Sequence, residues 1–228
     1  FFGLVPMTRR VCLFGSSCNP PTGDGGHRNL VRYFAGLFDE VWVLPVYKHI
    51  YASKRDLAPF EDRVAMCTLN FESIGPNVKV SRLEEEVVTE ALNRAIADGQ
   101  DPTKFYVGSY DLLLKIKEKN PEVDLYWVMG ADTYNDLRAG KWKNSELIPQ
   151  MVKIQLVVRP GVSLDYAADD VPNCTKHDVG TTDISSTKVR ENTDLEFLSS
   201  QLHPGVLQYI QEHKMYGFAE AGGDAPPS

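Results

Sequence analysis

The segment 22–27, TGDGGH, places three glycines before a histidine, between a short apolar run and a stretch with helical spacing of apolar residues. Glycine lets backbone amides approach a ligand without a Cβ atom in the way, and a helix starting here would present free amides to an anion. His27 could donate to a phosphate oxygen as charge develops on it. The alternative is a tight turn with an exposed His27, because the glycine spacing is that of neither a P-loop nor a dinucleotide fingerprint.

Hydroxyl groups and an arginine gather in the segment 183–192, DISSTKVREN. Ser185, Ser186 and Thr187 lie where a helix would begin, which suits helix capping beside free amides. Arg190 follows at a spacing that places it on the helix face of Ser186 and Thr187. Together these groups could clamp a polyphosphate. The alternative is an ordinary helix cap with a solvated arginine.

A carboxylate and an indole lie in the segment 127–142, WVMGADTYNDLRAGKW. Gly130 and Asp132 end a predicted strand, where a carboxylate can accept hydrogen bonds from ribose hydroxyls. Trp142 follows the next predicted helix, where its indole could stack on a flat ring. The alternative is that Asp132 caps the helix and Trp142 belongs to the core.

The elements that must position these groups alternate along the chain. Strand candidates at 11–14, 41–46, 78–83, 125–130 and 154–160 are separated by helical patterns that include 28–38, 59–71 and 109–121. The apolar runs are continuous, as in strands that are covered on both faces. This order predicts an α/β fold, a single Rossmann-like open parallel sheet with helices on both faces. Ligands bind such sheets at the carboxyl ends of the strands, where the three segments would meet.

Composition narrows the functional class. The chain has 228 residues and a net charge of −7 without a basic block, so we expect no nucleic-acid partner and no membrane partner. Its four cysteines lack zinc-site spacing and are interpreted as free thiols of a reducing, intracellular compartment, cytoplasmic or nuclear. A homo-oligomer is left open.

Five segments in order resemble one family. GSSCNPPTGDGGH (15–27) resembles the (H/T)xGH signature region of nucleotidylyltransferases, and ISSTKVR (184–190) is similar to their ISSTxxR motif. The segments 41–67, 130–142 and 202–217 resemble nicotinamide/nicotinate mononucleotide adenylyltransferases. We therefore interpret residues 11–217 as the catalytic domain. Residues 1–10 are interpreted as an N-terminal extension, in which Met7 could be the native start, and residues 218–228 as a flexible tail.

The resemblance implies a reaction. The 5′-phosphate of nicotinate or nicotinamide mononucleotide would attack the α-phosphate of ATP, giving a pyridine dinucleotide and pyrophosphate, a step of NAD biosynthesis. No covalent intermediate is expected, so catalysis would consist of positioning and charge stabilisation. Mg²⁺ would be carried on the ATP phosphates, without a metal site made by the protein.

The resemblance also implies residue roles. His27 and Arg190 would be catalytic. ATP would be bound by Gly15, Ser16, Ser17, Thr22, His27, Gly130, Asp132, Ser185, Ser186, Thr187 and Arg190. The mononucleotide would be bound by Ser16, Ser17, Lys54 and Trp142, with His49 as a weaker candidate.

The chain departs from the family pattern at three places. Thr22 stands where the first signature histidine is usual, and the loop to His27 is longer by two residues, so it must bulge. Cys18 replaces an aromatic residue, and SYDLLLKI (109–116) lacks a threonine that is common there. The alternatives are therefore another nucleotidyltransferase of the superfamily or a catalytically silent nucleotide-binding module. The choice between acid and amide substrate stays open.

Two further interpretations concern groups outside these motifs. The acidic run 83–90 is expected to be a solvated loop and helix start. His177, His203 and His213 are expected at the surface or at helix caps.

Overall fold

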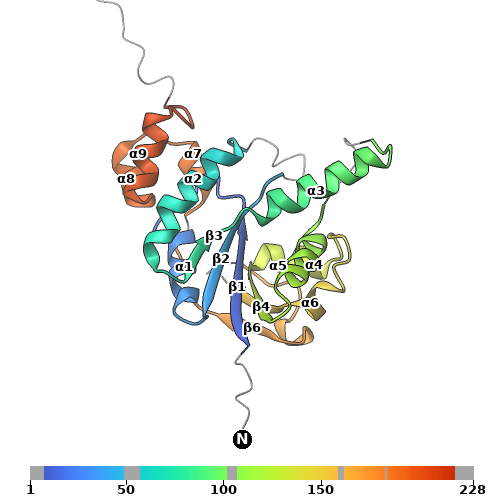
Figure 1. The fold of residues 1–228 in the computed structure, drawn as a ribbon. Coiled ribbons are helices and arrows are strands. Elements are labelled where there is room, and N and C mark those ends of the chain that lie inside the picture. The colour runs from blue at the N-terminus through green and yellow to red at the C-terminus, as the bar shows by residue number, and fades with distance from the viewer. Residues whose placement is uncertain (1–7, 49–56, 102–106, 159–161, 183, 219–228) are drawn as a thin grey trace, which may run out of the picture.

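The computed structural model describes residues 8–48, 57–101, 107–158, 162–182 and 184–218. The predicted contacts of His49 and Lys54 lie outside these ranges. Within them, six strands form one parallel sheet in the order β3-β2-β1-β4-β5-β6 (Figure 1). The strands are β1 (Arg9–Ser16), β2 (Glu40–Pro45), β3 (Val78–Val80), β4 (Val123–Gly130), β5 (Lys153–Val157) and β6 (Cys174–His177).

Helices cover both faces of this sheet, which confirms the predicted fold class (Figure 1). The α-helices are α1 (His27–Ala35), α2 (Phe60–Phe71), α3 (Leu83–Ala97), α4 (Ser109–Lys119), α5 (Ala131–Arg138), α6 (Ile148–Met151), α7 (Ser186–Arg190), α8 (Leu195–Gln201) and α9 (Pro204–Glu212). Short 3₁₀ turns occur at η2 (Glu72–Ile74) and η3 (Ala168–Asp170). In the described part of the chain no helix has the length and apolar character needed to cross a membrane.

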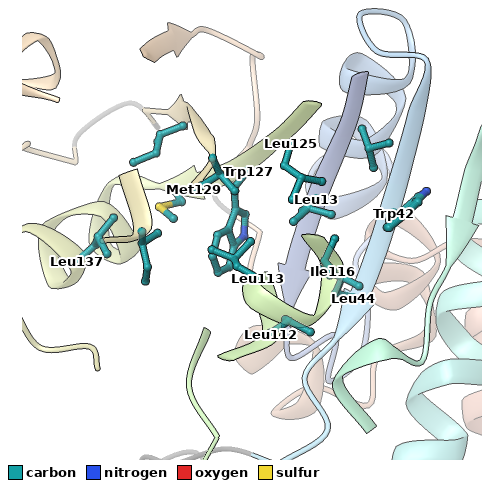
Figure 2. Packing of buried hydrophobic residues seen from close by; sticks show 14 of the residues in the cluster. Leu13, Trp42, Leu44, Leu112, Leu113, Ile116, Leu125, Trp127, Met129 and Leu137 are labelled. Carbon is teal, nitrogen blue, oxygen red and sulfur yellow. The ribbon is translucent and has the colours of Figure 1, made fainter. Parts of the chain in front are cut away.

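The continuous apolar run of β1 is explained by two cores, one on each face. Val11 and Leu13 belong to the cluster packed under α4, which Figure 2 shows around Trp127. Cys12 and Phe14 point to the other face and join the cluster under α1 and α2. Alternate residues of a strand face opposite sides, so a strand buried on both sides has no polar positions.

Two predicted boundaries are wrong. The strand expected over 78–83 ends at Val80, because α3 begins at Leu83 after the Ser81 hydroxyl accepts the Leu83 amide. The run 83–90, expected to be a solvated loop and helix start, is helical from Leu83 onward, and its Val87 is buried. The strand expected over 154–160 is β5, which ends at Val157, and residues 159–161 lie outside the described ranges.

The edge strand β6 was not predicted, and its His177 is not a surface or capping residue. His177 Nε2 donates to Gln155 Oε1 at 2.8 Å, and the Tyr33 hydroxyl lies 3.1 Å from its Nδ1. Burial lowers the pKa of His177, so the ring is kept neutral between these partners. By contrast, His203 caps α9 by accepting the Gly205 amide, as expected.

Candidate functional site

Two cavities at the carboxyl end of the sheet share His27 in their walls. The larger has a volume of about 400 Å³ and is lined by the predicted residues Gly15, Ser16, Ser17, His27, Gly130, Asp132 and Trp142. The smaller, of about 110 Å³, is lined by the predicted residues Thr22, His27, Ser185 and Ser186. Thr187 and Arg190 line neither of these two cavities.

The order of the strands explains why these segments meet. β1 lies between β2 and β4, so the chain leaves β1 toward one side of the sheet and later returns on the other. The ends of β1 and β4 flank this topological switch point, where open α/β sheets form their ligand crevice. Gly15 and Ser16 end β1, and Gly130 ends β4 as the N-cap of α5.

His27 is held by Thr22, the residue that replaces the usual signature histidine. The Thr22 amide donates to His27 Nδ1 at 3.1 Å, and Thr22 Oγ1 lies 3.0 Å from the same nitrogen. Because a backbone amide can only donate, Nδ1 is an acceptor, and the neutral ring carries its proton on Nε2. Nε2 lies 3.4 Å from Oγ of Ser16, which lines the larger cavity.

The longer loop therefore does not carry the imidazole away from β1. Its extra residues close a turn, in which the Gly26 amide donates to the Gly23 carbonyl at 2.9 Å. The Thr22 hydroxyl then accepts the His27 amide at 2.9 Å, and the Thr22 carbonyl accepts the Arg28 amide at 3.1 Å. The amides of His27 and Arg28 are thus used by the protein and are not free for an anion, contrary to the expectation for the start of this helix.

The glycines of this loop serve close packing within the protein. A Cβ atom on Gly25 would come within 2.5 Å of Thr182 Oγ1. A Cβ atom on Gly26 would lie 2.8 Å from Ile184 Cγ2 and would also collide with the Thr22 hydroxyl. Thr182, in turn, donates its amide to the Gly25 carbonyl at 2.9 Å. The glycines thus let the loop before α1 lie directly against the segment that leads into α7.

The segment around α7 is tied to the turn that precedes Thr22. Ser185 caps α7, since its side chain accepts the Lys188 amide, and Ser186 Oγ donates to the Pro20 carbonyl at 2.8 Å. Arg190 Nη1 donates to the Asn19 carbonyl at 2.6 Å, and its Nη2 to Thr187 Oγ1 at 3.3 Å. The predicted capping role of Ser185 is confirmed, and in this structure Arg190 holds the turn at Asn19.

A buried arginine that sequence reasoning missed connects the loops after β1 and β2. Arg63 is 1% exposed and donates to the carbonyls of Ser17 at 3.0 Å and Val46 at 2.6 Å. Its Nε donates to the Ala58 carbonyl at 2.9 Å. A buried guanidinium is tolerated only when its donors are satisfied, as here. The signal was its spacing, because Arg63 shares the buried face of α2 with Met66 and Cys67.

Several residues line the larger cavity without having been predicted, among them Lys48, Glu84, Trp127 and Asp136. Glu84, in the first turn of α3, accepts the Tyr47 amide at 2.9 Å. Burial raises the pKa of Glu84 to about 7, although the Tyr47 amide and the Arg63 charge act in the opposite direction. A carboxyl group that titrates near neutral pH therefore lies in the cavity wall.

The indole of Trp142 is half-buried and forms part of an aromatic wall. Its ring centroid lies 6.0 Å from that of Trp127 on β4, which Figure 2 shows within the core cluster. The same cavity is lined by Val87 of α3 and Leu112 of α4. Trp142 thus packs against the core and lines the cavity, so the two interpretations of its position are compatible. Cys18, the other departure near the site, is 1% exposed.

Comparisons with known proteins agree with this architecture. The cytidylyltransferase-like family model matches residues 13–192, which is most of the chain. A probable nicotinate-nucleotide adenylyltransferase of Bacillus pumilus is 29% identical over 212 residues, covering 91% of this chain and 98% of that protein. A probable nicotinate-nucleotide adenylyltransferase of Agrobacterium fabrum is 31% identical over 160 residues, covering 68% of this chain and 72% of that protein.

A solved structure supports the fold independently. The Plasmodium falciparum nicotinic acid mononucleotide adenylyltransferase complexed with NaAD matches with a TM-score of 0.71 at 20% identity, covering 92% of this chain and 98% of that chain. With the extent of the family model and the identity to the Agrobacterium protein, the chain belongs to the cytidylyltransferase-like family and, within it, to the nicotinate-nucleotide adenylyltransferases.

Proposed function

We propose that this protein transfers the adenylyl group of ATP to nicotinate mononucleotide, giving the dinucleotide and pyrophosphate. The observation that carries the proposal is His27, which lies in the wall of both cavities with its Nδ1 held by Thr22. A phosphate oxygen of the mononucleotide attacks the α-phosphorus of ATP, and the bond to the β-phosphate oxygen breaks. The acid is chosen over the amide because the matched relatives are nicotinate-nucleotide enzymes.

His27 acts in this proposal as a donor rather than as a base. Its Nε2–H is directed by the Thr22 contacts on the opposite side of the ring, and Ser16 Oγ lies beside it. The equatorial oxygens of the α-phosphate gain charge in the transition state, and a donor held in place beforehand stabilises that charge. Thr22 is thus the residue that keeps the imidazole in the productive tautomer.

The larger cavity suits the mononucleotide. Its indole wall at Trp142 and Trp127 offers a stacking surface for a pyridine ring. Asp132, which is expected to bind ATP, offers a carboxylate for ribose hydroxyls in the same cavity. Lys48 brings a positive charge to the same cavity and is proposed for the mononucleotide phosphate together with Lys54.

The smaller cavity suits the triphosphate. Its wall carries the hydroxyls of Thr22, Thr181, Thr182, Ser185 and Ser186 beside His27. Arg190 is placed next to this wall by its bonds to Asn19 and Thr187, and its remaining N–H groups are proposed for the ATP phosphates.

Magnesium is proposed to enter with ATP. Among the described residues, no group of three histidine, cysteine or acidic side chains gathers in a way that could hold a metal ion. Mg²⁺ keeps several waters and binds readily to phosphate oxygens, so it would neutralise charge on the triphosphate. The chain's own contribution is to orient the phosphates around it.

Pyrophosphate release with ATP and each mononucleotide tests the proposal. His27→Ala should lower turnover by about 10²–10³, the usual cost of one preorganised donor, while ATP affinity measured by calorimetry stays close to that of the parent. His213→Ala is the matched control, because this exposed histidine at the end of α9 lies outside both cavities.

Three outcomes would contradict the proposal. A His27→Ala protein within about threefold of parental turnover would remove His27 from the chemistry. ATP binding without pyrophosphate release from either mononucleotide would indicate a binding module. Release with another phosphorylated acceptor alone would indicate a different transferase of the superfamily.

A further inference from the structure

An ion pair joins two walls of the larger cavity that are distant in sequence. Lys143 Nζ lies 3.1 Å from each carboxylate oxygen of Asp111, a residue 32 positions earlier in the chain. Asp111 is in the first turn of α4, and Lys143 lies in the loop that follows α5. The pair therefore connects α4 with the loop that carries Trp142.

Each partner is directly connected to residues that line the cavity. Asp111 Oδ2 accepts the Gly108 amide at 2.9 Å, and both Gly108 and Ser109 line the cavity at the start of α4. Lys143 follows Trp142, whose indole lines the same cavity. The Asp111 carboxylate thus contacts the backbone at the start of α4, and the Lys143 ammonium group belongs to the residue next to Trp142.

The loop that presents Trp142 has a second ion pair on its opposite side. Lys141 Nζ lies 2.6 Å from Asp136 Oδ1 of α5, and Asp136 also lines the cavity. Trp142 is therefore placed between one ion pair to α5 and another to α4. The pair to α5 spans only five residues and is local, so of these two pairs it is the one between Lys143 and Asp111 that links the Trp142 loop to α4.

We propose that Asp111 and Lys143 are positioning residues that set the width of the pyridine slot between Trp142 and the start of α4. This inference rests on the proposed function, in which the larger cavity takes the mononucleotide. The pair touches neither the small cavity nor His27, so its loss acts on mononucleotide binding and leaves ATP binding and the chemical step unchanged. Asp111 lies in SYDLLLKI, the segment that lacks a threonine common in the family.

The test uses Asp111→Asn, Lys143→Met and the double variant. Asn keeps an oxygen that can accept the Gly108 amide, and Met keeps the apolar stem of Lys143. Partly exposed ion pairs contribute about 0.2–1 kcal/mol, so the KM for the mononucleotide should rise roughly 1.4- to 5-fold, with kcat and the KM for ATP unchanged. The double variant should show the same rise as either single variant, because both remove one interaction.

Salt and a conservative substitution give independent readouts. Raising NaCl should increase the mononucleotide KM of the parent toward that of the variants and change the variants less, because salt screens the pair. Lys143→Arg should keep the parental KM. Lys115→Met is the matched control, since Lys115 lies on α4, pairs with Glu90 at 2.9 Å and does not line the cavity.

Direct calorimetric titration with nicotinate mononucleotide separates this inference from the proposed function. If the parent protein binds the mononucleotide but releases no pyrophosphate, the proposed reaction is refuted. The mononucleotide affinities of the parent and the variants would then still test the positioning role. Equal increases in KM for both substrates, additive effects in the double variant, or an unchanged mononucleotide affinity in Asp111→Asn would each overturn the positioning role.

Discussion

Replacing Glu84 with glutamine should remove the part of the pH dependence of stability that comes from the ionisation of this carboxyl group. Glu84 lines the larger cavity and accepts the Tyr47 amide at 2.9 Å, and burial raises its pKa to about 7 from the ordinary 4.5. Glutamine has nearly the same shape, and its side-chain oxygen can still accept the Tyr47 amide. The substitution therefore removes the ionisation and leaves the contact.

The sign of the effect follows from proton binding. Between pH 4.5 and about 7 the folded protein keeps the Glu84 proton while the unfolded chain loses it. The free energy of unfolding therefore falls as pH rises through this window, and the loss is complete above the folded pKa. The difference between 4.5 and about 7, at about 1.36 kcal/mol per pH unit, corresponds to roughly 3 kcal/mol.

Urea unfolding at pH 5 and at pH 8 measures this difference. The unfolding free energy of Glu84→Gln minus that of the parent should be about 2–3 kcal/mol larger at pH 8 than at pH 5. All other titrating groups are shared, so this change reports on Glu84. Glu86→Gln is the control, since Glu86 is exposed on the same helix and pairs with Lys119. A Glu84→Gln protein whose stability changes with pH in parallel with the parent would show that Glu84 is ionised normally, and the reasoning would be wrong.

Two further substitutions probe the substrate contacts. Arg190→Ala removes the charge-assisted hydrogen bonds proposed between Arg190 and the ATP phosphates, as well as its bond to the Asn19 carbonyl. A charge-assisted bond is worth about 1.5–3 kcal/mol, so the KM for ATP should rise roughly ten- to hundredfold in a folded protein. Unchanged ATP kinetics would limit Arg190 to holding the Asn19 turn. Trp142→Ala should weaken the mononucleotide more than ATP, by roughly two- to tenfold for the loss of about 0.5–1.5 kcal/mol of stacking. It should also reduce the quenching of the protein's fluorescence by the mononucleotide to the part that Trp127 contributes. Equal losses for both substrates would mean that Trp142 serves only the core.

The central part of the fold could be predicted because local sequence carries its physical cause. The runs at 11–14 in β1 and 125–130 in β4 are apolar at nearly every position, as expected for strands covered on both faces. Helical spacing of apolar residues identified α1, and the proline that opens the segment 59–71 supported α2. The edge strand β6, CTKH, was missed because a strand at the edge of the sheet that is partly exposed to solvent needs no apolar run, and its pairing with β5 is formed by backbone groups.

The positions of the motifs followed from the predicted sheet, because parallel strands end at one edge. That reasoning brought His27, Asp132 and Ser186 to neighbouring cavity walls. It did not find Glu84, since an acidic run is usually solvated, and only the packing of α3 against the end of β2 desolvates one of its carboxylates.

What the sequence by itself determined is therefore the order of the elements and the residue types at the ends of the strands. Which group contacts which was decided by tertiary structure, because the partners are brought together only when helices and loops pack around the sheet. Arg190 reaches the Asn19 carbonyl across 171 residues, and Asp111 meets Lys143 across 32. Even the neighbours Thr22 and His27 could not be paired from their spacing, because the turn that aims the Thr22 amide at Nδ1 depends on Gly25 and Gly26 packing closely against the segment before α7.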